Sequence, residues 1–191
     1  MNMAGMFTAI LVTLPPVVFL IILFGGGFLS LRKHIDQDGN SPMNRTLFYT
    51  SKWSVVILWI VMMLQVWGIQ ISLIEVPTGL IWVSLFLWFF GFALLYYGRF
   101  KLGGSFRLGT PKESTNLTTD GLFRFSRNPM YLGLYSTIVA SIVYTLNPLV
   151  LLLGIFVIVV HHKIVLGEEA YMQKVFGQEY LDYCRRVRRY I

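Results

Sequence analysis

Two groups of residues in this sequence have side chains suited to chemistry, and the first is the stretch 127–133, in which Asn128 precedes Pro129. Asparagine often caps a helix and proline is tolerated as its first residue, so we predict a helix that begins at Pro129. The amides after the cap lie at the positive end of the helix dipole, which suits a carboxylate or a phosphate. A well-capped membrane helix with interfacial arginines and aromatics explains the same residues without a ligand.

The second group is the adjacent pair Glu168 and Glu169, which follows a long apolar run. Carboxylates flanked by apolar helix are costly unless a cation meets at least one of them. That cation is either a ligand group, such as an ammonium or a sulfonium, or a side chain, with Lys163, Arg124 and Arg127 as candidates. The residues alone leave both interpretations open.

In the C-terminal half, three further residues have thiol or imidazole groups: His161, His162 and Cys184. The two histidines could form a metal site with Glu168, but adjacent residues point to different faces of a helix, so we predict no metal site. The single cysteine excludes an internal disulfide. We interpret it as a bystander, with palmitoylation of a tail cysteine as the alternative.

The elements that must position these residues are membrane helices. Of 191 residues, 55% are hydrophobic and 13% are charged, and the mean hydropathy is +0.64. A soluble domain of this size cannot bury so much apolar surface. Apolar stretches of about 20 residues, the length that crosses a bilayer, recur with almost no charge inside them. The sequence therefore predicts an all-α integral membrane protein with a single membrane domain over residues 1–191.

We expect about five transmembrane helices followed by a C-terminal amphipathic helix at the membrane surface. The alternation of apolar and charged residues at helical spacing places that last helix in residues 168–191. In the first span, Pro15 and Pro16 would interrupt the helix of a soluble protein. In a membrane bundle, neighbouring helices can satisfy the backbone groups that proline leaves free, so we expect a kink or close helix packing there. The predicted spans are residues 6–31, 52–74, 80–98, 129–146 and 148–167.

The positive charges predict how the chain crosses the membrane. All 16 Lys and Arg lie around the loop after the first span, between Arg99 and Arg127, or from Lys163 onward. With five spans these regions share one side, which the positive-inside rule makes cytosolic. We therefore expect the N-terminus outside, and the C-terminus and the site, formed by residues 99–128 and 168–191, in the cytosol. The net charge of +7 then favours anionic lipid headgroups as partners, and no recognition module indicates nucleic-acid binding.

Four motifs occur together in the C-terminal half: residues 127–133, the Asn147-Pro148 turn, the Glu168-Glu169 pair and residues 176–180. Their order and spacing resemble the isoprenylcysteine carboxyl methyltransferase and phospholipid methyltransferase family, over about Leu102 to the C-terminus. The resemblance implies a membrane enzyme that transfers a methyl group from S-adenosylmethionine to a lipid-linked carboxylate or a phospholipid amine. The implied partners are a lipophilic or lipidated substrate and membrane lipids.

The resemblance also implies a cofactor site. Leu117 and Thr118 would contact S-adenosylmethionine through backbone groups, and Glu168 and Glu169 would bind its polar end. Because the sulfonium is already activated, we expect no nucleophilic residue. The residues implied to line the rest of the cofactor pocket are Asn128, Pro129, Met130 and Tyr131.

The acceptor decides which side chains act on it. A carboxylate needs a cation, for which Arg127, Arg124 and Lys163 are candidates, whereas an amine needs a base such as Glu168 or a histidine. We therefore name Arg127 and Glu168 as the candidate catalytic residues and a prenylcysteine-type carboxylate as the expected acceptor.

Other functions stay open at this stage. The prenylcysteine enzymes usually have histidine where this chain has Asn128, and an arginine just before the glutamate pair, where residues 161–167 contain none. A phospholipid amine is therefore the alternative acceptor. An NADPH-dependent sterol-type membrane reductase and a non-enzymatic membrane scaffold are the alternatives outside methyl transfer.

Overall fold

The computed structural model describes residues 3–30, 44–103 and 116–191. Within these ranges the chain is helical and contains no strand. Among the basic residues used to predict topology, Arg32, Lys33, Arg107 and Lys112 lie outside the described residues. The described helices are α1 (Met3–Ser30), α2 (Arg45–Val66), α3 (Thr78–Leu102), the short 3-10 helix η3 (Gly121–Arg124), α4 (Pro129–Thr145), α5 (Pro148–Phe176) and α6 (Gln178–Arg186).

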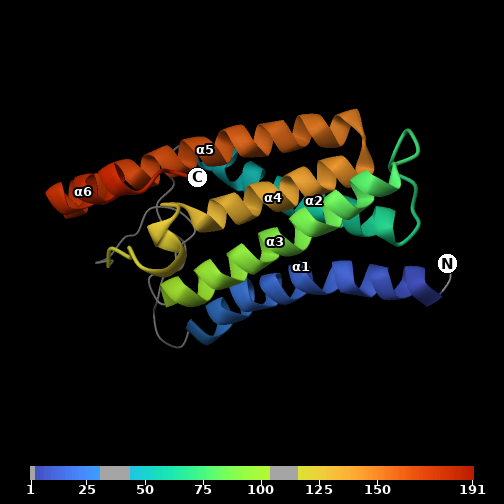
Figure 1. Cartoon of the computed structure of the whole chain (residues 1–191), viewed down its shortest axis with the longest axis horizontal. Coiled ribbons are helices and arrows are strands. Elements are labelled where there is room, and N and C mark those ends of the chain that lie inside the picture. Colours follow the sequence, from blue (N-terminus) through green and yellow to red (C-terminus); the bar gives the residue numbers. More distant parts are fainter. Residues whose placement is uncertain (1–2, 31–43, 104–115) are drawn as a thin grey trace.

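The five long helices form an elongated bundle in which consecutive helices run in opposite directions (Figure 1). The C-terminal ends of α1, α3 and α5 therefore lie at the same end as the N-terminal ends of α2 and α4. We call this the site end, because α6 and the segment before α4 also lie there. The two short turns, after α2 and after α4, are at the opposite end.

Four helices are long and apolar enough to cross a membrane: α1, α2, α3 and α5. α4 has 17 residues, which is the lower end of the usual length of about 17–25 for a span. It lies within the bundle beside α3 and α5 (Figure 1). The all-α membrane architecture is confirmed, and a fifth span in α4 stays a prediction.

The two prolines do not interrupt α1, and α3 supplies donors to the backbone around them. Pro16 has no N–H, so the carbonyl of Val12 loses its usual helical donor. The indole nitrogen of the buried Trp88 donates to that carbonyl at 3.1 Å, and the hydroxyl of Tyr96 donates to the carbonyl of Pro15 at 2.7 Å. For the carbonyl of Val12, the structure bears out the interpretation that a neighbouring helix satisfies a group that proline leaves free.

α3 and α4 pack closely through glycine. A Cβ added at Gly91 of α3 would lie 2.6 Å from the carbonyl oxygen of Gly133, and one added at Gly133 would lie 2.6 Å from that of Gly91. Small residues let membrane helices approach until their backbones touch. This contact fixes α4, and hence the motif at its N-terminus, against α3.

The region after the predicted fifth span differs from the prediction of one amphipathic helix over residues 168–191. α5 continues through Gly167 to Phe176 and ends at Gly177, which has a φ of +53° and separates it from α6. A glycine inside a helix costs only about 1 kcal/mol, whereas glycine at positive φ is a common helix end. Glu168 and Glu169 therefore lie inside a long helix, about two turns before its end.

Candidate active site

A cavity of about 490 Å³ lies at the site end of the bundle, within the range of about 300–1,000 Å³ that is usual for ligand pockets. It brings together the segment before α4, the first turn of α4 and the second half of α5. The residues that the sequence analysis named for catalysis or cofactor binding all line it: Leu117, Thr118, Arg127, Asn128, Pro129, Met130, Tyr131, Glu168 and Glu169.

Much of the rest of the cavity wall is apolar, and the largest share of it comes from the N-terminal half of the chain. Phe19 on α1 and Trp59 on α2 meet edge to face, with ring centroids 6.1 Å apart. Leu20, Leu23 and Val56 continue this surface. One cavity thus joins the polar motifs of α4 and α5 to an apolar wall built by α1 and α2.

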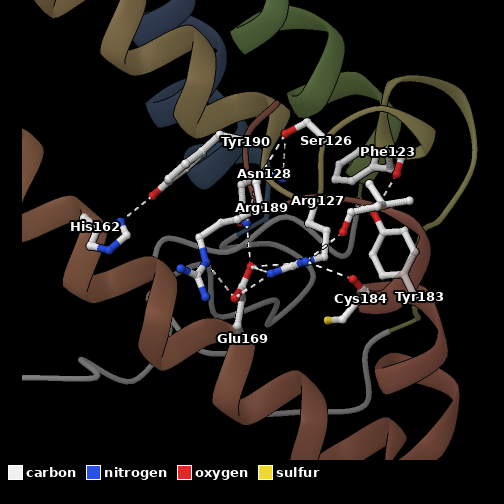
Figure 2. A network of polar contacts seen from close by, with 11 residues as sticks. Phe123, Ser126, Arg127, Asn128, His162, Glu169, Tyr183, Cys184, Arg189 and Tyr190 are labelled. Carbon is white, nitrogen blue, oxygen red and sulfur yellow. Dashed lines mark hydrogen bonds and ion pairs between the residues drawn. The ribbon is translucent and has the colours of Figure 1, made fainter.

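Glu169 is held by three side chains (Figure 2). Arg127 donates to both carboxylate oxygens at 3.1 Å, Arg189 donates at 2.9 Å, and the amide nitrogen of Asn128 donates at 3.0 Å. The side chains of Arg127 and Glu169 are only 11% and 12% exposed. The cation that meets Glu169 is therefore the chain's own, which the sequence had left open.

Arg127 also binds the C-terminal segment. Its Nη1 donates to the carbonyl of Val187 at 2.7 Å and its backbone N–H donates to the carbonyl of Arg188 at 2.9 Å. Burial acts to lower the pKa of Arg127, but the charge of Glu169 and their hydrogen bonds leave that pKa raised. All three guanidinium nitrogens donate within this network, so Arg127 joins α5 to the C-terminal segment at the cavity wall.

Asn128 has a different role from the predicted cap. α4 begins at Pro129 as predicted, but no side chain caps it, because Asn128 donates to Glu169 and to the carbonyl of Arg189 instead. A hydrogen bond to a charged acceptor is stronger than one to a neutral group, which favours this orientation. The first turn of α4 therefore meets the cavity without a capping side chain.

Glu168 has separate surroundings although it is adjacent to Glu169. Successive residues on a helix point about 100° apart, and Glu168 is turned toward α4, where the hydroxyl of Tyr131 donates to it at 2.9 Å. It lines the cavity. Of the two glutamates, Glu168 is thus the one outside the arginine network.

His161 and His162 have different hydrogen-bond partners. His161 is buried, lines the cavity and bonds through Nδ1 to the carbonyl of Val157 at 2.9 Å. His162 bonds through Nδ1 to the hydroxyl of Tyr190 at 2.8 Å. In the described part of the chain, no group of three or more His, Cys, Asp or Glu side chains could hold a metal ion.

Lys52 on α2 is a cavity residue that the sequence analysis did not select. It is half-buried, and its ammonium lies over the ring of Phe48, 3.7 Å from the centroid. A lysine among apolar residues at the start of a span is a signal for a functional residue, but its proximity to the site depends on how α2 packs.

Arg124 and Lys163, the other candidate cations, are exposed and are not among the described lining residues.

Within the described residues, the fold is therefore a bundle of apolar helices with a cavity whose polar motifs lie at one end. A family model described as phospholipid methyltransferase matches residues 78–179, from the start of α3 into α6. This is just over half of the chain, and the chain belongs to that family.

The family match confirms the resemblance seen in the motifs. Membership indicates a membrane methyltransferase acting on lipid-type substrates, and methyltransferases of this kind generally use S-adenosylmethionine. The match favours methyl transfer over the reductase and scaffold alternatives. The comparison with curated proteins and the comparison with solved structures each found no match.

Proposed function

We propose that this protein transfers a methyl group from S-adenosylmethionine to a lipophilic acceptor that is dissolved in the membrane. The proposal is supported by a cavity that is lined by residues from both halves of the chain. Its motif residues, including Thr118, Tyr131 and Glu168, face one ligand space together with Phe19 and Trp59. A water-soluble cofactor and a lipid can meet only where such surfaces adjoin.

The residues at the polar end fit S-adenosylmethionine. The N-terminus of α4 has no side-chain cap, and its positive dipole end suits the methionine carboxylate. Glu168, bound by Tyr131 but outside the arginine network, suits the ammonium or the ribose hydroxyls. Glu169 supports this site by holding Asn128 and Arg127 in place.

In this reaction the main task of the protein is to position the acceptor, and a reactive side chain is less important. S-adenosylmethionine supplies a methyl group already activated on a sulfonium, so what matters is alignment of the acceptor in a water-poor site. Phe19, Trp59, Leu95 and Leu134 line the cavity and exclude water from the acceptor's path. The role of these residues is to bind and orient an apolar chain.

We propose a prenylcysteine-type carboxylate as the acceptor. The support is a cation, Lys52, on the cavity wall in addition to the Arg127 network. A phospholipid amine is the second candidate, favoured by the description of the family that matches. For an amine, Glu168 or His161, both lining the cavity, would accept the proton.

We also propose that the site end faces the cytosol. The basic ends of α3, α5 and α6 gather there with the start of α2, as Figure 1 shows. The positive-inside rule assigns such an end to the cytosolic side.

The test is methyl transfer by the purified protein in lipid nanodiscs with radiolabelled S-adenosylmethionine. The acceptors are a prenylated cysteine, phosphatidylethanolamine, and short water-soluble analogues with the same reacting groups. We expect transfer to a lipidated acceptor and little to its short analogue, because binding of the remote chain positions the reacting group. Absence of transfer to every acceptor by protein that retains its fold would contradict the proposal.

A further inference from the structure

Four polar side chains from three helices surround one part of the cavity: Lys52 of α2, Tyr131 of α4, and His161 and Glu168 of α5. Tyr131 donates to Glu168 at 2.9 Å, and the rings of Tyr131 and His161 lie 6.3 Å apart. The family motifs account for Tyr131 and Glu168. They do not include Lys52, which comes before the matched residues 78–179.

Packing holds the ammonium of Lys52 at this place. It lies 3.7 Å from the ring centroid of Phe48 and 5.6 Å from that of Tyr49, distances at which a cation is attracted to an aromatic face. Phe48 is fully buried and packs with Val160 and Ile164 of α5, and Tyr131 packs against the same cluster. The positive charge is therefore fixed on the side of the cavity that holds Tyr131 and Glu168.

The charged side chains among the described lining residues are two cations and two carboxylates, and Arg189 adds a further cation to Glu169. Arg127 and Glu169 form one pair. The remaining charged lining residues are Lys52 and Glu168, and the charge of Lys52 acts on Glu168. S-adenosylmethionine with an ionised carboxylate, an ammonium and a sulfonium has a net charge of about +1, so its binding leaves the site with an excess of positive charge. In a partly dehydrated site this excess favours an anionic second ligand.

We propose that Lys52 binds the anionic oxygen group of the acceptor and thereby selects lipids that have one close to the reacting atom. In a prenylcysteine this group is the carboxylate, and in a phospholipid it is the phosphate. The inference rests on the proposed methyl transfer and adds to it the headgroup charge of the substrate and the residue that recognises it.

The experiment compares Lys52→Gln, Lys52→Arg and wild type in nanodiscs of phosphatidylcholine. The acceptors are a prenylated cysteine, phosphatidylethanolamine, and a long-chain alkylamine that has no anionic group. Lys163→Gln is the matched control, because it removes one lysine charge from an exposed position on α5 outside the described cavity lining. The measurements are KM and kcat for each acceptor, and the Kd of S-adenosylmethionine.

We expect Lys52→Gln to raise KM for the anionic acceptor about tenfold or more, the scale of one lost charge-assisted hydrogen bond. Its Kd for S-adenosylmethionine should stay near the wild-type value. Lys52→Arg should restore most of the affinity, and Lys163→Gln should match wild type. Loss of turnover with the prenylated cysteine would show that Lys52 binds a carboxylate. Loss of turnover with phosphatidylethanolamine would show that it binds a phosphate.

An unchanged KM in Lys52→Gln, or equal loss of turnover with the alkylamine, would overturn the inference.

Failure of the proposed function is a separate result, namely no transfer to any acceptor by wild type. In that case lipid binding still tests Lys52, through the fluorescence of Trp53 and Trp59, which also line the cavity. Weaker binding of the anionic lipids by Lys52→Gln supports the inference, and equal binding contradicts it.

Discussion

Arg127 and Glu169 form a bidentate ion pair that joins the residue before the α4 cap position to the last third of α5. The same guanidinium binds the carbonyl of Val187, so one side chain fixes three segments of the chain. Such a pair is worth little on a surface, but its loss from a buried site leaves an uncompensated charge.

The Arg127→Ala variant should therefore be strongly destabilised, by about 3–5 kcal/mol, because Glu169 stays buried with only part of its partners. Arg127→Lys should be destabilised as well, since an ammonium cannot donate to both carboxylate oxygens in the planar geometry of a guanidinium. Thermal unfolding in detergent measures both variants. Arg185→Ala, which removes an exposed arginine paired with Asp182, is the control, and equal stability of the Arg127 and Arg185 variants would contradict this role.

Glu168→Gln should weaken the binding of S-adenosylmethionine by about 1–3 kcal/mol, the usual contribution of a hydrogen bond to a charged group. Glutamine keeps the size of the side chain and can still accept from Tyr131, so the fold should survive. Titration calorimetry on the folded variant measures the effect, with Glu179→Gln of the exposed α6 position as the control. Unchanged affinity for S-adenosylmethionine would show that the role of Glu168 is structural.

Gly91→Ala should separate α3 from α4, because its Cβ would lie 2.6 Å from the backbone oxygen of Gly133. A backbone neighbour cannot move aside like a flexible side chain, so we expect destabilisation of about 1–3 kcal/mol. Gly79→Ala is the matched control on the same helix, since nothing lies within 4 Å of its added Cβ. Equal unfolding temperatures of the two variants would show that the contact between α3 and α4 does not depend on glycine.

The proposed topology predicts the side of the membrane on which reporters appear. A reporter fused at Ile191 should be cytosolic and one inserted at Thr78 should lie on the opposite side, because Thr78 starts α3 at the end away from the site. Protease protection or a compartment-sensitive reporter measures this. A cytosolic signal at Thr78 would contradict the arrangement of five spans.

The sequence by itself determined the class of fold and indicated residues that line the cavity. Apolar runs of span length impose membrane helices because the bilayer offers no partner for backbone polar groups. The motif at Asn128 and Pro129 located the start of α4 correctly, since proline restricts the backbone locally. The Glu168-Glu169 pair and residues 117–118 also line the cavity as expected.

The tertiary structure alone decided the partners of these residues. The network of Glu169 with Arg127 and Arg189 forms only because the C-terminal segment returns to residues 126–128, a contact that leaves no periodic pattern in the chain. Lys52 reaches the site through the packing of α2 against α5. α5 continues past Gly167 and ends at Gly177, because Gly177 and not Gly167 adopts a positive φ. Local preference and hydrophobicity act along the sequence, whereas the pairing of charges depends on which helices touch.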